Sequence, residues 1–275
     1  MPILHEHSSM GWKAIALLWV CFEAGAATPS DGPARSIGAA ASGCLAGAQS
    51  LAFDGDGYSV VRTTRERYYG HGALIDYIQQ LGTRVAASGL GTLLVGDLSL
   101  ARGGRMPYGH SSHQNGLDVD IWFHIAPKPP FSPLDALRDP GVQPSLLNPG
   151  KTGLSPSLWN GRQSRLLRLA AEAPTLDRIF VNPVIKRELC RSMPGGWLHK
   201  LRPWYGHDDH FHARLTCPTD SPACQPQAPP PPGDGCGSEL DWWFQPHQPE
   251  HKPPAAPIRQ PPECAALSAE KRIEE

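Results

Sequence analysis

The chain has 275 residues, with 25 basic and 26 acidic side chains and a formal net charge of −1. This balance gives no electrostatic reason to expect a nucleic acid or an anionic membrane as partner, so both classes are set aside. The length suffices for one domain with a sizeable core.

The N-terminus has the pattern of an export signal. Lys13 precedes the apolar run 14–22, and the small residues 24–26 follow, as signal peptidases require. We therefore expect a signal peptide over residues 1–26, with an uncleaved anchor or a chance hydrophobic N-terminus as the alternatives. The apolar run is about half of the ~20 residues that cross a bilayer, so no membrane span is expected in the mature form.

The segments before residue 151 have different periodicities. Apolar residues at helical spacing predict a helix within residues 64–88, and a buried strand is predicted at residues 93–95. Between residues 117 and 123, Leu117, Val119 and Ile121 alternate with Asp118, Asp120 and Trp122, which is typical of a strand. The Pro-rich residues 124–150 lack a period and predict a long surface loop near the rim of a site.

Two helices and two strands are predicted in the second half. Ser155-Pro156 and Asn182-Pro183 each have the pattern of a helix start, with a capping side chain before a first-turn proline. A strand is predicted at residues 178–181. Residues 210–215 alternate again, so their histidines share one face of a strand and their apolar side chains the other.

The C-terminal part differs in composition from the rest. Residues 218–275 are rich in proline and include the run 229–232, which forms neither a helix nor a central strand. We therefore expect a main domain over residues 27–217 and an extension over residues 218–275 that packs on it. The segment 240–244 should pack back on the domain, because exposed aromatic rings are costly. Binding of glycan or peptide by these rings is the alternative.

Six of the seven cysteines lie outside the predicted signal. An even number in an exported chain indicates disulfides, but six cysteines allow 15 pairings and the sequence alone does not choose. Cys217 and Cys224 are close enough to close a small loop. A cysteine-bound zinc is less favoured, because no Cys-x-x-Cys pair occurs.

Five of the twelve histidines fall within residues 110–120 and 207–212. We take His113, Asp120 and His212 as the ligands of one metal ion. Two imidazoles and a carboxylate suit zinc and leave a fourth position for water, whereas calcium and magnesium prefer oxygen ligands. The spacing therefore predicts a catalytic zinc site.

The remaining histidines are candidates for roles around that ion. His210 lies two residues before His212 on the same strand face and is the candidate acceptor for the proton of the water. His207 could stabilise the oxyanion or donate to the leaving amine, and the two roles could be exchanged. His110 could be a fourth ligand or could orient another ligand.

Simpler explanations are less favoured. Isolated histidines often satisfy backbone groups, but here five of them cluster with several aspartates. The helical motif His-Glu-x-x-His is absent. Ser111 and Ser112 lie beside histidines but in no Gly-x-Ser-x-Gly or Ser-x-x-Lys motif, so serine chemistry has little support.

The segment 109–120 resembles the penicillin-insensitive murein endopeptidases, and the resemblance extends from about residue 35 to the C-terminal extension. Three further segments agree with it: residues 181–186 with Cys190, 202–212 and 233–240. The resemblance implies an α+β fold, in which a central antiparallel sheet is flanked by helices and long loops. It also implies periplasmic cleavage of the D-alanyl to meso-diaminopimelyl cross-links of peptidoglycan, by a mechanism that penicillin does not block.

Matching the functional residues of this family to positions in this sequence gives the same roles as the residues alone. The resemblance implies that His113, Asp120 and His212 ligate zinc, that His110 lies in or beside that shell, and that His207 and His210 are catalytic. The pairings that it implies are Cys44 with Cys264, Cys190 with Cys236, and Cys217 with Cys224. Some relatives have an acidic residue and a histidine for a second metal after the first motif. Residues 147–151 offer neither, so a second metal is doubtful.

Two rival functions use the same residues. A zinc carboxypeptidase or dipeptidase for D-Ala-D-Ala would need similar ligands and a closed pocket for a free carboxylate. A non-catalytic peptidoglycan-binding module would keep the zinc and the cleft without turnover. The presence of His210 argues against the second rival.

Overall fold

A computed structural model describes residues 28–127, 138–246 and 259–270. The signal peptide expected over residues 1–26 lies outside this part of the chain. Within it, no helix combines the length and the apolar character that a bilayer crossing requires.

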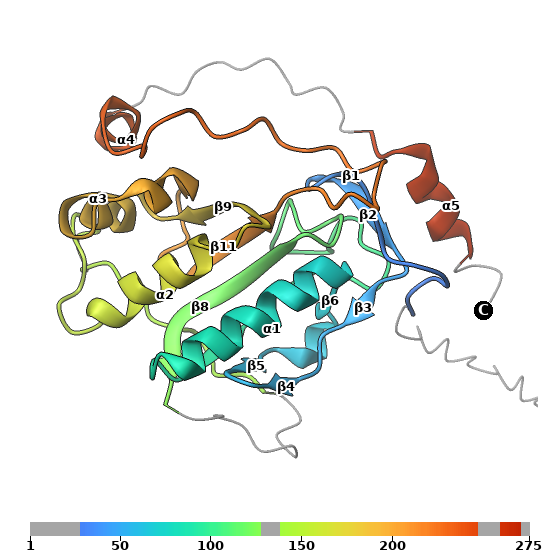
Figure 1. Cartoon of the computed structure of the whole chain (residues 1–275), viewed down its shortest axis with the longest axis horizontal. Coiled ribbons are helices and arrows are strands. Elements are labelled where there is room, and N and C mark those ends of the chain that lie inside the picture. The colour runs from blue at the N-terminus through green and yellow to red at the C-terminus, as the bar shows by residue number, and fades with distance from the viewer. Residues whose placement is uncertain (1–27, 128–137, 247–258, 271–275) are drawn as a thin grey trace, which may run out of the picture.

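A seven-stranded sheet organises the described residues (Figure 1). Its four central strands, β9, β11, β8 and β7, are antiparallel, which confirms the α+β class with a central antiparallel sheet. The parallel pairs β10 with β9 and β5 with β7 extend this centre and were not predicted. In spatial order the strands are β10 (Leu201–Pro203), β9 (Leu176–Val181), β11 (His210–Leu215), β8 (Asp118–Ala126), β7 (Thr92–Val95), β5 (Tyr58–Val60) and β4 (Asp54–Gly55).

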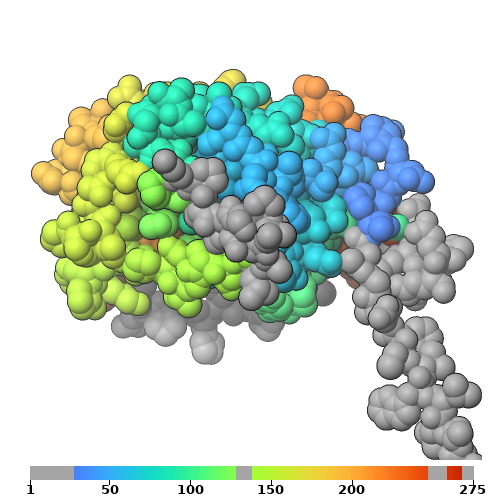
Figure 2. Space-filling view, turned by 90° about the horizontal axis from the view of Figure 1, so that it is seen from below, coloured from blue at the N-terminus to red at the C-terminus, as the bar shows by residue number. Residues whose placement is uncertain are grey.

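Two small sheets lie in the N-terminal part. The strands β1 (Arg35–Ala39) and β2 (Ser42–Ala46) form a hairpin. β3 (Gln49–Ser50) pairs with β6 (Tyr69–Gly70). Figure 2 shows that the segments before β7, in blue to teal, lie against the yellow-green segments that follow β8.

The helix predicted within residues 64–88 is α1 (Gly72–Ala87), and it begins later than predicted. The 3₁₀ turn η1 (Thr63–Arg65) and strand β6 occupy the start of the predicted range. His71 then caps the helix, since its side chain accepts a hydrogen bond from the amide of Ala73. α1 lies against the sheet (Figure 1) and buries Leu74, Ile78 and Val85 in the core.

The helix predicted at Ser155-Pro156 was wrong in its start. α2 spans Gly161–Ala171 and is capped by Asn160, whose side chain forms a capping box with Gln163. The prediction at Asn182-Pro183 is confirmed: α3 (Pro183–Ser192) begins there, with the Asn182 side chain accepting from the amide of Val184. A 3₁₀ turn, η2 (Gly196–Lys200), follows and leads into β10.

The extension crosses the molecule and returns (Figure 1). Its short helix α4 (Ser238–Asp241) and the 3₁₀ turn η3 (Trp242–Phe244) lie near α3, and its last helix, α5 (Pro262–Glu270), lies near β2. All three implied disulfides are present: Cys44–Cys264, Cys190–Cys236 and Cys217–Cys224. The extension is therefore covalently tied to the domain at three places.

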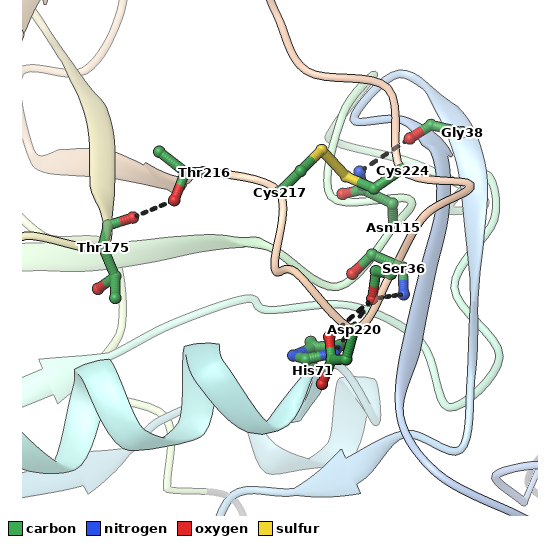
Figure 3. The surroundings of a disulfide bond; sticks show 10 residues. Ser36, Gly38, His71, Asn115, Thr175, Thr216, Cys217, Asp220 and Cys224 are labelled. Carbon is green, nitrogen blue, oxygen red and sulfur yellow. Dashed lines mark hydrogen bonds and ion pairs between the residues drawn. A yellow bond between two sulfur atoms is a disulfide. The ribbon is translucent and has the colours of Figure 1, made fainter.

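The loop closed by Cys217–Cys224 anchors the start of the extension (Figure 3). Ser221, in this loop, accepts a hydrogen bond from the amide of Ser36 at 3.0 Å, and its hydroxyl lies 3.3 Å from Nε2 of His71. The loop thereby joins β1 to the cap of α1.

The aromatic segment 240–244 packs back only in part. Leu240 is buried at 2% exposure, as expected, but Trp242 and Phe244 are 49% and 38% exposed. The expectation that all three rings would be covered was therefore wrong.

Candidate metal site and catalytic cleft

Strands β8 and β11 bring the two histidine-rich segments together. In their antiparallel register His212 is paired with Asp120, and Arg214 with Asp118. Paired residues point to the same face of a sheet, so two acidic side chains of β8 meet an imidazole and a guanidinium of β11. The resulting distance from His212 Nδ1 to Asp120 Oδ1 is 3.3 Å.

His113 reaches this face from the loop before β8. Its backbone has a φ of 66°, which is unusual for a residue with a side chain. Its Nδ1 lies 2.7 Å from the carbonyl oxygen of Leu98, which can only accept, so Nδ1 donates. The neutral ring then has its lone pair on Nε2, which lies 3.4 Å from Oδ1 of Asp120.

Gly116 allows the chain to turn from this loop into β8. Its φ is 75°, and a Cβ atom there would lie 2.5 Å from Cδ2 of Leu45. Only glycine fits this position without displacing the core.

Three buried atoms at this point have no hydrogen-bond partner: His113 Nε2, Asp120 Oδ1 and His212 Nε2. Leaving a buried polar atom unsatisfied costs about 1–3 kcal/mol, so three together need a compensating interaction. A divalent cation would provide it for His113 Nε2 and Asp120 Oδ1, and two imidazoles with a carboxylate are typical zinc donors. On His212 the nitrogen near Asp120 is Nδ1, at 3.3 Å, while Nε2 faces Asp118 at 3.4 Å. Within the described residues, the groups of three or more possible ligands are His110 with His113 and Asp120, and His113 with Asp118 and His212.

Asp118 contacts two of the candidate ligands, His113 and His212. It is fully buried, accepts two hydrogen bonds from Arg214 at 2.7 and 3.0 Å, and lies 3.4 Å from Nε2 of His212. It also accepts a hydrogen bond from the backbone amide of His113. Burial raises the pKa of Asp118, but the charges of Arg214 and His212 outweigh burial and hold this pKa well below its usual value. Asp118 is therefore an anion that fixes the orientation of two candidate ligands.

His110 lies between two carboxylates. Its Nε2 is 3.0 Å from Oδ2 of Asp97 and 3.5 Å from Oδ2 of Asp120. Asp97 is buried and is also bound by Arg67 at 2.7 Å and by Arg65 at 3.2 Å. His110 is thus held beside the candidate ligands by Asp97, which is not among the site residues predicted from the sequence.

The position of Asp97 in the sequence does indicate a buried polar group. It is an acidic residue inside the apolar segment around β7, and it is 5% exposed. Buried carboxylates need partners, so a charge in such a run indicates a polar network. Nothing in the local pattern showed that the partner would be His110.

His210 and His207 lie at the solvent side of the same site. His210 Nε2 is 3.7 Å from Oδ2 of Asp120, and its Nδ1 is hydrogen-bonded to Asp209. The ring of His207 lies 5.1 Å from that of His210, and its backbone φ is 52°. Five histidines and Asp120 therefore converge, as expected, while their individual roles stay predictions.

The two outer histidines have opposite electrostatic environments. Burial lowers the pKa of His210, but Asp120 and Asp209 outweigh burial and raise this pKa to about 9. Burial, followed by the charges of His210 and His212, lowers the pKa of His207 to about 4. Without a metal ion, His210 is accordingly an imidazolium at neutral pH and His207 a neutral imidazole.

An open cleft borders the site. Its lining includes His110, His207 and His212, with Ser112, Phe180 and Trp204. His207 and His212 thus face the same solvent-accessible space as His110. Hydrolysis of a bound peptide requires such a shared space.

Comparisons with known proteins agree with this site. Residues 36–269 match the family described as penicillin-insensitive murein endopeptidase. A protein of that name from Haemophilus influenzae is 48% identical over 221 residues, covering 80% of this chain and 76% of the relative. Another from Klebsiella pneumoniae is 46% identical over 243 residues, covering 87% and 88%. A third, from Yersinia enterocolitica, is 44% identical over 242 residues, covering 87% of each.

Proposed function

Because the chain belongs to the penicillin-insensitive murein endopeptidases, we propose that it is a zinc-dependent hydrolase that cuts the peptide cross-links of murein. The observation that carries this proposal is the buried pair His113 Nε2 and Asp120 Oδ1, which lie 3.4 Å apart without a hydrogen-bond partner, with Nδ1 of His212 3.3 Å from the same Asp120 oxygen. A buried imidazole nitrogen and a carboxylate oxygen that face each other without a hydrogen bond need a cation, and the open cleft beside them would admit a peptide.

In this proposal His113, Asp120 and His212 hold the zinc ion. When bound, zinc lowers the pKa of a bound water towards about 7 and polarises the scissile carbonyl. Neighbouring residues orient the ligands: Asp118 orients His212, and the carbonyl of Leu98 fixes the tautomer of His113.

His210 and His207 are assigned to proton transfer. His210 is oriented by Asp209, and its Nε2 lies 3.7 Å from Oδ2 of Asp120. A cation bound to Asp120 would offset the carboxylate charge that raises the pKa of His210, and the neutral ring could then accept a proton at Nε2. His207 lines the cleft and would stabilise the oxyanion or donate to the leaving amine. The two roles could still be exchanged. His110, held by Asp97, is assigned a place in or beside the ligand set.

The expected cleavage point is the D-alanyl to meso-diaminopimelyl amide bond. The proposed chemistry uses no serine nucleophile that a β-lactam would acylate, which fits a penicillin-insensitive reaction. Three disulfides suit an oxidising compartment such as the periplasm. Together with the export signal expected over residues 1–26, they support the periplasm as the place of action.

Purified cross-linked muropeptide dimers provide the test. The mature chain should convert dimers to monomers, lose this activity with its zinc after chelation, and regain it when zinc is restored. Release of free D-alanine without monomers would favour a carboxypeptidase instead. Activity that survives complete removal of the metal would contradict the proposed mechanism.

A further inference from the structure

A second concave region lies beside the catalytic cleft. We name it the aromatic groove and define it by Val184, Tyr205, Asp208, Trp243 and Phe244. Its volume is about 380 Å³, within the roughly 300–1,000 Å³ typical of ligand pockets. Two of its aromatic side chains come from the C-terminal extension and one from the catalytic domain.

The extension is fixed where it contributes to this groove. The hydroxyl of Tyr205 donates to the carbonyl of Trp243 at 3.2 Å, and the two rings are in edge contact at 4.9 Å. An ion pair between Arg202 and Glu239 and the disulfide Cys190–Cys236 hold the preceding residues. The residues of the extension that line the groove are therefore held in place by specific contacts with the domain.

The groove and the cleft share one segment of chain. Trp204 and His207 line the cleft, while Tyr205, Gly206 and Asp208 line the groove. Trp204 also lies 6.1 Å from Trp243, between ring centroids. A polymer whose cross-link occupies the cleft can thus continue into the groove without leaving the surface.

The rings around this segment are exposed to solvent. Trp204 is 55% exposed, Tyr205 58% and Phe244 38%, while Trp243 is half-buried. Arg187 stacks on Phe244 at 3.9 Å from the ring centroid, which orients that ring. Contiguous exposed aromatic surface next to a cleft is typical of a ligand-binding site.

We propose that the aromatic groove binds a pyranose ring of the glycan strand that carries the peptide in the cleft; this rests on the proposed function. One face of a pyranose presents C–H groups, which pack on the electron-rich face of an aromatic ring, while its hydroxyls point outward to polar groups. Asp208 and Lys151 supply such polar groups in the lining. Flat rings edged by polar side chains match the C–H face and the outward hydroxyls of a sugar.

The distances in the substrate permit this arrangement. An extended chain spans at most about 3.3–3.6 Å per residue, so a stem peptide of about four residues places its sugar within roughly 14 Å of the cross-link. A groove that begins one residue from the cleft wall, at Tyr205, lies within reach of that sugar.

The test compares two substrates that differ only in sugar. One is a cross-linked dimer that carries its disaccharides, and the other is the same dimer after an amidase has removed them. We expect kcat/KM of the zinc-loaded enzyme to be about tenfold higher for the first, which corresponds to about 1.4 kcal/mol. In Phe244→Ala and in Trp243→Ala this ratio should fall to within about twofold of one, with the rate on the peptide-only dimer unchanged.

Trp242→Ala is the matched control, because Trp242 is an exposed tryptophan of the same turn whose ring contacts Trp243 edge to face at 5.3 Å between centroids but does not line the groove. It should keep the tenfold ratio. Equal rates of the wild type on the two substrates would overturn the inference, as would equal losses on both substrates in the two groove variants, or the same lost ratio in Trp242→Ala. No cleavage of either dimer by the wild type would instead refute the proposed function.

Discussion

Asp120 and His212 are direct partners across β8 and β11, and Oδ1 of Asp120 lies 3.3 Å from Nδ1 of His212. The next pair on the same face, Asp118 with Arg214, is an ion pair at 2.7 Å. Because the side-chain period of a strand is two, both pairs depend on one register. The candidate metal site and its anionic support are therefore set by the same sheet contact.

Removal of the Asp118 charge should weaken metal binding without removing a proposed ligand. In Asp118→Asn we expect zinc affinity to fall about 10- to 100-fold, because the group that orients His212 and His113 no longer carries a full charge. Competition with a chelator of known affinity measures this. Asp209→Asn is the control, since Asp209 contacts His210 and should leave zinc affinity within about twofold. Equal losses in both variants would contradict the assignment.

Replacement of His210 should separate catalysis from metal binding. We expect His210→Ala to retain one zinc per chain and to lose about 10²- to 10⁴-fold in kcat, the usual contribution of a general acid or base. Metal analysis and dimer hydrolysis on the same sample check this. Wild-type turnover in this variant would remove His210 from the reaction.

Lys186 should make stability depend on pH. Its side chain is fully buried and donates to the carbonyls of Leu198 and Asp234. Burial, followed by the charge of Arg202, lowers its pKa from 10.5 to about 7. The unfolded chain then binds the extra proton between about pH 7 and 10.5, so the free energy of unfolding rises with pH across that window.

The comparison for this prediction is Lys186→Met. The wild type should gain stability relative to the variant by up to about 1.4 kcal/mol per pH unit above pH 7, and the difference should be constant below it. Urea unfolding at several pH values measures this. A difference that is independent of pH up to pH 10 would show that Lys186 stays charged in the fold.

The disulfides should differ in their contribution to stability. Cys44–Cys264 closes a separation of 220 residues and Cys217–Cys224 one of 7. Chain entropy alone predicts losses of about 5 and about 2 kcal/mol when each is replaced by a pair of serines. Chemical unfolding of the two double variants tests the order, and a larger loss from the small loop would show that contacts around it, such as those of Ser221, dominate.

Much of the site could be predicted from the sequence, because its chemistry is carried by residue type and short spacing. The period of two over residues 117–123 and 210–215 correctly placed Asp120 and His212 on strands. Asp97 could not be assigned to His110, because the contact depends on how β7 and the loop before β8 pack in three dimensions.

The errors in the fold have local causes. Tyr69 fits the helical spacing of the residues that follow, but it pairs with Ser50 in a small sheet, so α1 begins at Gly72. Ser155-Pro156 has the composition of a helix start, yet the capping box of Asn160 and Gln163 sets the real one. In both cases a tertiary or capping interaction outweighed a propensity signal.

The bond between Cys44 and Cys264 ties an early strand to the last helix. A nascent chain cannot close this link until residue 264 has been translated and has reached an oxidising environment. Covalent maturation of the protein is therefore a late event, and a product truncated before α5 would lack that link.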